Sequence, residues 1–111
     1  MDTAFHTKLE HDDLAWTVVC GGELDVATAM RLEEAFDLCE QMLPRSIHID
    51  ARDVTFIDST GITSLIHCAH RCNEEGIGFS LDPSEQVRAI LHEAGIAERL
   101  LLGRPSAPTP A

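Results

Sequence analysis

The segment Asp58-Ser59-Thr60-Gly61 places a serine hydroxyl between an apolar run and a helical pattern. In the first turn of a helix the backbone N–H groups have no intrahelical acceptor, and the helix dipole is positive there. A phosphate group on Ser59 can therefore be accommodated without melting the helix. Phosphorylation adds about −1.5 to −2 charge units at neutral pH. Beside Asp58, we expect this charge to change the surface more than the fold.

A second interpretation gives Ser59 a purely structural role. Serine is common at the N-cap position of helices, because its side-chain oxygen accepts a hydrogen bond from a backbone N–H group of the first turn. The local sequence is compatible with both interpretations and does not choose between them.

The segment His67-Cys68-Ala69-His70-Arg71-Cys72 contains four potential metal ligands in six positions. On a helix, however, Cys68 and Cys72 lie on one flank of the apolar face and the two histidines lie toward the other flank. Four ligands from one short helix cannot surround an ion tetrahedrally. We therefore expect no metal site, with the cysteines acting as small hydrophobic residues and the histidines in solvent.

No catalytic constellation is visible. An aspartic protease motif has an aspartate, one hydroxyl residue and then glycine, whereas two hydroxyl residues follow Asp58, and such a site needs a second carboxylate. A nucleophilic side chain needs a base held by a third group, and His48 alternates away from the apolar face of its strand. The chain also has no glycine-rich loop with a lysine to hold phosphates. We expect neither an enzyme nor a cofactor.

The elements that position these residues follow from hydrophobic periodicity. Alternating apolar residues predict strands, and apolar residues three and four positions apart predict helices. The expected strands cover residues 5–11, 14–20, 47–51 and 77–81, and the expected helices cover residues 32–43, 59–75 and 83–94. This order predicts a small α/β sheet of mixed direction with helices packed mainly on one face.

Several residues predict how these elements begin and end. Gly21-Gly22 indicates a turn after the second strand, and Asp25 can then cap the first helix. Asp53 lies in an expected loop after the third strand, which separates that strand from the apolar run 54–57.

The third helix has the fullest set of signals. Asp82 is a candidate N-cap, Pro83 suits the first helical position, and Glu85 stands where a capping box needs a carboxylate. Gly76 and Gly95 are placed for the left-handed residues that commonly follow helix ends.

The composition indicates one acidic domain. A chain of 111 residues can hold one core, which we expect in residues 1–103, with a disordered tail in the proline-, serine- and alanine-rich residues 104–111. The formal net charge of −11 repels nucleic acids and anionic lipids. There is neither a long apolar run nor a secretion signal. We expect a cytoplasmic protein with reduced cysteines and without nucleic-acid or membrane partners.

Part of this negative charge lies on the first expected helix. Glu33, Glu34, Asp37 and Glu40 lie opposite its apolar stripe. We expect them to form a solvated face, which can also steer encounters with a basic partner.

Three motifs together resemble the STAS domain family of anti-sigma-factor antagonists. They are Gly22-Glu23-Leu24-Asp25, the run Val54-Thr55-Phe56-Ile57-Asp58-Ser59-Thr60-Gly61-Ile62, and a stretch from Asp82-Pro83-Ser84 through Val87-Arg88 to Ala94-Gly95-Ile96. The resemblance extends from about Phe5 to Leu102. It implies a STAS-like domain with a mixed sheet of four to five strands and three to four helices.

The resemblance also implies a partner-switching cycle. In this family the unmodified protein binds an anti-sigma factor that is also a serine kinase, which releases a sigma factor. The kinase uses ATP to phosphorylate the first hydroxyl residue of the D-S-[ST]-G motif, here Ser59, and the complex separates until a phosphatase removes the phosphate. By position, Asp58, Thr60, Gly61 and Ile62 lie in the surface that the kinase covers, and Asp25 borders it.

The sequence leaves some alternatives open. Thr63-Ser64 stands where the family often has glycine and an aliphatic residue, which bears on the choice of partner. Other STAS domains serve as scaffolds or as regulatory subunits of signalling or transport assemblies, and these often lose the acceptor hydroxyl. The intact Asp58-Ser59-Thr60-Gly61 therefore favours the switch. The identity of the sigma factor, kinase and phosphatase, any use of Thr60, nucleotide binding and the oligomeric state stay open.

Overall fold

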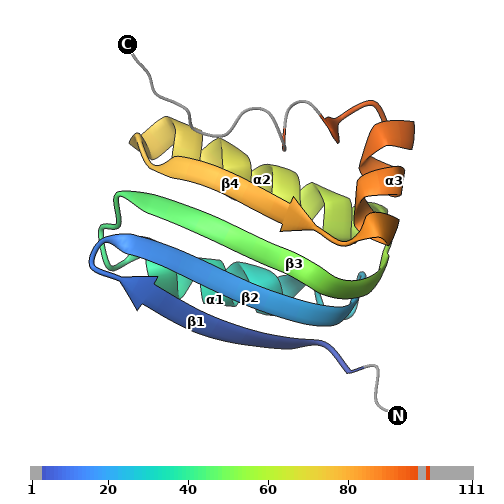
Figure 1. The fold of residues 1–111 in the computed structure, drawn as a ribbon, viewed down its shortest axis with the longest axis horizontal. Helices are drawn as coiled ribbons and strands as arrows, with labels where there is room; N and C mark the ends of the chain where they lie inside the picture. Colours follow the sequence, from blue (N-terminus) through green and yellow to red (C-terminus); the bar gives the residue numbers. More distant parts are fainter. Residues whose placement is uncertain (1–3, 98–99, 101–111) are drawn as a thin grey trace.

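The computed structural model of the protein describes residues 4–97 and 100. Its centre is a four-stranded sheet in the order β1-β2-β3-β4 (Figure 1). The strands are β1 (His6–Asp12), β2 (Ala15–Leu24), β3 (Ser46–Ile57) and β4 (Gly78–Pro83). β1 is antiparallel to β2, whereas β2, β3 and β4 are parallel to one another. The predicted mixed sheet is thus confirmed, at the lower end of the expected strand number.

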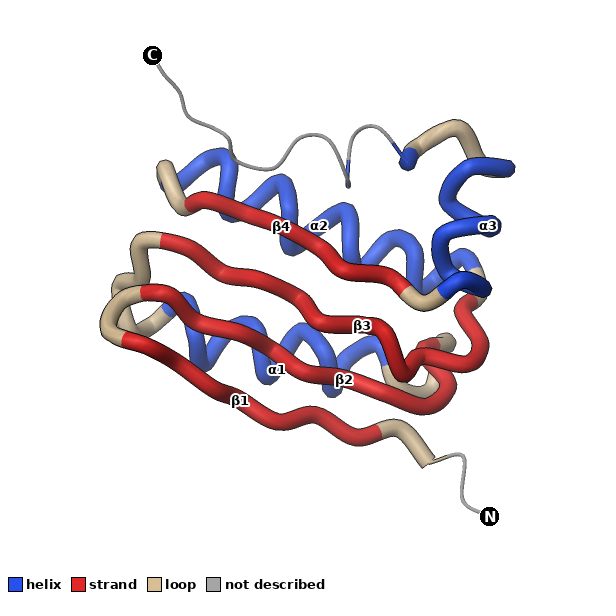
Figure 2. Tube along the Cα trace, in the orientation of Figure 1, coloured by secondary structure: helices blue, strands red, loops and turns tan. Residues whose placement is uncertain are grey.

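Three helices complete the described part of the domain: α1 (Ala29–Glu40), α2 (Ser59–Glu75) and α3 (Glu85–Glu93). α1 and α2 lie on the same side of the sheet, behind the strands in Figures 1 and 2. α3 follows β4 directly and packs against β3 and β4. The prediction of helices mainly on one face is confirmed.

The core fills the space between the sheet and the helices. One face of each strand supplies apolar side chains to it, because successive strand residues point to opposite faces. Fully or almost fully buried core residues include Val18, Cys20, Ile47, Ile49, Leu32, Phe36, Leu65, Cys68, Val87 and Leu91. Burial of this apolar set is the main force that holds the helices against the sheet.

The middle strands are longer than the sequence pattern indicates. Gly21 pairs with Asp53 and Gly22 with Val54, so the expected turn and the expected loop are both strand, with register shifts on either side of these pairs. Gly22 has a φ of 96°, and a Cβ atom there would lie 2.6 Å from the Ala4 carbonyl oxygen. Glycine is therefore required at this position for a bulged strand and not for a turn.

The start of α3 also differs from the prediction. Asp82 and Pro83 continue β4, because they pair with Asp50 and Ala51 of β3. The N-cap is Ser84, whose hydroxyl oxygen accepts a hydrogen bond from Val87 N at 3.2 Å. The strand pairing thus moves the helix start two residues beyond the predicted cap.

The first helix, α1, begins and ends three residues earlier than the expected range 32–43. The glycines predicted at the ends of the other two helices are confirmed. Gly76 follows α2 with a φ of 73°, and Gly95 lies shortly after α3 with a φ of 75°. Ile96 N donates to the Leu91 carbonyl oxygen at 3.1 Å, which satisfies an acceptor at the end of α3. The predicted tail, residues 104–111, lies outside the described residues. Within the described ones, none of the helices has the length and apolar character that a membrane crossing requires.

Candidate partner-binding site

Ser59 is the first residue of α2 and its side chain is exposed. β3 ends at the buried Ile57, so the chain passes from the core to the surface within two residues. The hydroxyl makes no hydrogen bond to any described residue. The interpretation of Ser59 as the helix cap is therefore wrong, and the group is available to another molecule.

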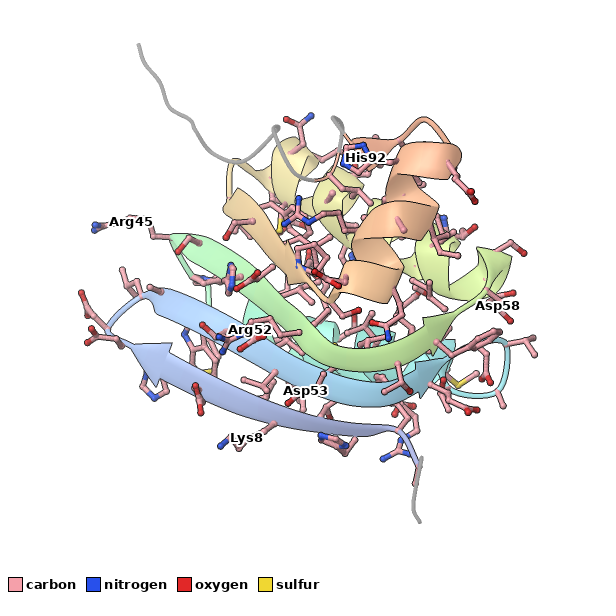
Figure 3. The ribbon with its side chains drawn as sticks, turned by 45° about the vertical axis from the view of Figure 1, so that its right-hand side comes forward. Lys8, Arg45, Arg52, Asp53, Asp58 and His92 are labelled. Atoms are coloured by element: carbon pink, nitrogen blue, oxygen red, sulfur yellow. The ribbon has the colours of Figure 1, made fainter. Side chains whose placement is uncertain are left out.

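Asp58 performs the capping role instead. Its Oδ1 accepts a hydrogen bond from Gly61 N at 3.0 Å, and its Oδ2 accepts one from Val26 N at 3.2 Å. The first bond satisfies a free N–H group of α2, and the second ties the loop between β2 and α1 to the same carboxylate. Figure 3 shows Asp58 where β3 passes into α2. One side chain thus fixes two segments of the candidate site.

Gly61 is buried and makes the close contact between α2 and β2 possible. A Cβ atom at this position would lie 2.4 Å from the Leu24 carbonyl oxygen and 2.8 Å from Ile57 Cγ1. Real Cβ atoms do not approach backbone oxygens so closely, so any larger residue would push the helix start away. The absence of a side chain at Gly61 therefore allows the start of α2, which carries Ser59, to lie close to β2.

The loop before α1 is held mainly by its own polar groups. The Asp25 carboxylate accepts hydrogen bonds from Ala27 N at 2.9 Å and from Thr28 N at 3.2 Å. Thr28 occupies the N-cap position of α1, and its hydroxyl donates to the Glu23 carbonyl oxygen at 2.6 Å. Asp25 is thus not the N-cap, but the preceding turn depends on its carboxylate.

The α2 terminus retains unused hydrogen-bond donors. The backbone N–H groups of Ser59 and Thr60 have no acceptor among the described residues, whereas Gly61 N is satisfied by Asp58 and Ile62 N by the Asp58 carbonyl oxygen. Two free donors at the positive end of a helix form a favourable setting for a phosphate oxygen.

Large apolar side chains are exposed on the segments that meet at this terminus. Val26 is 75% exposed, Met30 68% and Phe56 49%. Val26 is bonded through its N–H group to Asp58, Met30 lies in the first turn of α1, and Phe56 is three residues before Ser59. The hydrophobic pattern does not distinguish these residues, because Val26 and Met30 lie outside the expected strands and helices and Phe56 stands in a short apolar run. Exposed apolar side chains in one area mark surfaces that bind other proteins.

The acidic face of α1 is used inside the domain. Arg71 of α2 donates to the Asp37 carboxylate at 2.7 Å and to the Glu40 carboxylate, and its guanidinium lies over the Phe36 ring. The expectation of a solvated face is therefore wrong for Glu40, whose side chain is 15% exposed, whereas the Asp37 side chain is still 46% exposed. The single positive charge of Arg71 offsets one of these two negative charges.

The two residues of the unusual pair Thr63-Ser64 differ, because Thr63 is exposed and Ser64 faces the inside of the domain. Ser64 is buried, and its hydroxyl donates to the Glu33 carboxylate of α1 at 2.7 Å. The Thr63 hydroxyl donates to the Ser59 carbonyl oxygen at 2.9 Å. Ser64 thus contributes to packing between the two helices, and Glu33 of the same acidic face is also only partly solvated.

The cysteine and histidine residues of α2 lie as predicted. Cys68 and Cys72 are buried in the core, whereas His67 and His70 are exposed. Burial raises the pKa of Cys72 to about 12 and also raises the pKa of Cys68. Such thiols are protonated near neutral pH and are poor nucleophiles. No cluster of three potential metal ligands occurs within the described residues.

Comparison with known proteins identifies the family to which the chain belongs. The model of the STAS domain matches residues 6–108. The chain therefore belongs to the STAS domain family, which confirms the resemblance of its sequence motifs.

Particular members of the family are clearly similar. An anti-sigma-B factor antagonist of Staphylococcus aureus is 40% identical over 87 residues, which cover 78% of this chain and 81% of that protein. The crystal structure of an anti-sigma factor antagonist from Mycobacterium paratuberculosis has a TM-score of 0.75 at 26% identity and covers 90% of this chain and 86% of that one. A sulfate transporter family protein from Wolinella succinogenes has a TM-score of 0.68 at 25% identity, with 81% and 74% covered.

Proposed function

We propose that the protein is an anti-sigma factor antagonist. In its unmodified form it binds an anti-sigma factor that is a serine kinase and so releases a sigma factor. Phosphorylation of Ser59 by this kinase ends the binding, and a phosphatase restores it. The 40% identity to an anti-sigma-B factor antagonist supports the class of function. The observation that carries the switch is the exposed Ser59 hydroxyl, which is free because Asp58 caps α2.

The proposed binding surface combines the motif with its surroundings. Asp58, Ser59, Thr60 and Ile62 supply its centre, with Gly61 beneath it and Asp25 at its border. Around this centre lie the exposed apolar side chains of the β2–α1 loop, the end of β3 and the first turn of α1. A partner would cover these groups together, which removes apolar area from water and excludes solvent from the Ser59 hydroxyl.

A phosphate on Ser59 would oppose binding without opposing folding. The modified side chain remains in solvent, and its charge lies near two free N–H groups at the α2 terminus. In the complex the same charge would be buried against the partner and beside the Asp58 carboxylate. Burying an unpaired charge costs several kcal/mol or more, so the affinity would fall while the domain stays intact.

The role is regulatory and cytoplasmic. The proposal assigns phosphoryl transfer to the partner kinase, and the protein supplies only the acceptor hydroxyl. The high pKa of the buried cysteines and the exposure of His67 and His70 support this division, since neither set provides an activated nucleophile with a positioned base.

The direct test is incubation with candidate anti-sigma factor kinases and ATP, followed by mapping of phosphate by mass spectrometry. We expect one phosphate, on Ser59. Ser59→Ala should bind the kinase persistently in the presence of ATP, and Ser59→Asp should bind it poorly. Equal affinity of the two variants would contradict the switch.

A second candidate role is a regulatory or scaffold subunit in a larger signalling or transport assembly. The structural likeness to a sulfate transporter family protein supports this second role. The two roles differ in their dependence on Ser59. Binding of an assembly partner that is indifferent to both Ser59→Ala and Ser59→Asp would support the second role.

A further inference from the structure

β1 is an edge strand with one side unused. It pairs with β2 along one edge, and no strand lies along its other edge among residues 4–97 and 100. An edge strand presents a row of backbone N–H and C=O groups that can pair with another strand. β1 is seven residues long, which is sufficient for a regular antiparallel ladder.

The charges along β1 have a self-complementary order. In an antiparallel pair of two β1 strands centred on Leu9, Lys8 of each copy lies opposite Glu10 of the other, and His6 lies opposite Asp12. Moving the centre of the pair by one residue gives one of two other registers. A pair centred on residue 8 places Lys8 opposite Lys8, and a pair centred on residue 10 places Glu10 opposite Glu10. Because like charges directly opposite one another are destabilising, the charges select the register centred on Leu9.

The charged side chains are free to make these pairs. Lys8 and Glu10 are 67% and 54% exposed, and within one chain they contact only each other, with Nζ and Oε2 3.2 Å apart. Figure 3 shows Lys8 projecting from β1 away from the other strands. Exchanging an exposed contact within one strand for two cross-strand pairs keeps every charge partnered.

On the opposite face of β1, Leu9 is an apolar residue between Thr7 and His11. Leu9 is half-buried against the core and pairs in register with Val18. α1 runs beside β1, and near its start Arg31 lies over the ring of Phe5, which precedes β1. Leu38, 56% exposed, follows Arg31 by seven residues. That is two helical turns on the same flank, about 10.5 Å or roughly three strand residues beyond Phe5. This spacing brings Leu38 level with about residue 8 of β1, next to Leu9 along the strand.

From the strand edge, the order of charges and the exposed leucine we infer that β1 pairs with β1 of a second copy of this chain, centred on Leu9. The two sheets join into one continuous sheet, with the helices of both copies on the same side. Leu9 meets Leu9 beneath the Lys8–Glu10 pairs, and Leu38 of each copy flanks them. The inference does not depend on the proposed function.

The pairing leaves the candidate partner-binding site open. β2 lies between β1 and β3, so Ser59 is not at the joined edge. Because the two β1 strands run antiparallel, the two Ser59 sites lie toward opposite ends of the joined sheet. Each copy in the pair can therefore meet its own partner.

The test is sedimentation of the full chain from low to high micromolar concentration at about 0.15 M salt, where much of the repulsion between two acidic chains is screened. We expect a monomer–dimer equilibrium. Lys8→Glu and Glu10→Lys should each raise the dissociation constant at least about tenfold, because two opposite-charge pairs become two like-charge pairs. An equimolar mixture of the two variants should form heterodimers, and the double variant should recover self-association.

Matched controls separate pairing from net charge. Arg88→Glu and Glu93→Lys make the same charge changes at exposed positions of α3 and should leave the dissociation constant unchanged. Thermal unfolding of each variant should stay near that of the parent chain. A parent chain that remains monomeric at the highest concentration would overturn the inference, and so would single variants that associate as well as the parent.

Discussion

Ser59 and Ser84 both lie at the start of a helix, yet the chain uses them in opposite ways. Ser84 is 8% exposed, and its hydroxyl oxygen caps α3 by accepting from Val87 N. Ser59 is exposed and one position farther into its helix, because Asp58 holds the N-cap position of α2. The Ser84 hydroxyl stabilises the start of its helix, whereas the Ser59 hydroxyl makes no hydrogen bond to the described residues.

The difference depends on the residue before each serine. Before Ser59 stands an aspartate, which is as good a cap as serine and relieves it of that role. Before Ser84 stands Pro83, which is still paired in β4 and has no side chain that can cap. A capping aspartate placed directly before a serine therefore creates an exposed hydroxyl at a positive helix end. Four substitutions test this comparison.

The largest effect on stability is expected from Gly61→Ala, which disturbs the packing under Ser59. Its Cβ atom would overlap the Leu24 carbonyl oxygen, and overpacking of this kind costs about 1–3 kcal/mol. Gly78→Ala is the matched control, because a Cβ atom there meets its nearest neighbour at 3.5 Å. Chemical denaturation measures both. If Gly61→Ala is as stable as Gly78→Ala, the close approach of α2 to β2 is wrong.

Asp58→Ala removes the residue that distinguishes the two serines. Loss of the cap and of the bond to Val26 N should reduce the free energy of unfolding by about 1–2 kcal/mol. Amide hydrogen exchange should become faster at Gly61 and Val26. Asp58→Asn should retain the bond to Gly61 N and show an intermediate loss. Unchanged exchange at Val26 in Asp58→Ala would show that the carboxylate does not hold the loop.

Ser84→Ala should lower the free energy of unfolding by about 1 kcal/mol, because Val87 N loses its acceptor in a buried position. Phosphorylation of Ser59 by a partner kinase should be unchanged. The measurements are denaturation and phosphate incorporation on the same sample. A loss of phosphorylation in this variant, at a temperature where it is folded, would mean that the two helix starts are coupled.

Ser59→Ala should have the smallest effect on stability, within about 0.5 kcal/mol, as expected for an exposed side chain without structural partners. It should nevertheless abolish phosphate incorporation. Phosphate that appears on Thr60 in this variant would show that the second hydroxyl can serve as acceptor. A stability loss as large as that of Ser84→Ala would contradict the different roles of the two serines.

Much of the fold could be predicted from local patterns. Hydrophobic periodicity located every helix, and Gly76 and Gly95 marked helix ends because left-handed residues strongly favour glycine. The errors arose where strand pairing decided the outcome. Asp53 looked like a loop residue, yet its pairing with Gly21 makes β3 continuous. Asp82 looked like a cap, yet its pairing with Asp50 extends β4.

In the candidate site, too, local sequence patterns could not predict features that depend on contacts between distant segments. The position of Ser59 at the start of a helix followed from the sequence, but its free hydroxyl depends on which neighbour performs the capping. The acidic residues of α1 looked solvated, because the sequence does not reveal that Arg71 faces Asp37 and Glu40 from another helix. Likewise, the exposure of Val26 and Phe56 depends on how three distant segments meet.

The central claim is that phosphate on Ser59 ends binding while the domain remains folded. The most direct measurement compares the chain with and without phosphate on Ser59, in affinity for one anti-sigma factor kinase and in thermal unfolding midpoint. We expect the affinity to fall by at least about tenfold, or 1.4 kcal/mol, with nearly equal midpoints. Equal affinity of the two forms would contradict the account, and so would lost binding accompanied by a large drop in the midpoint.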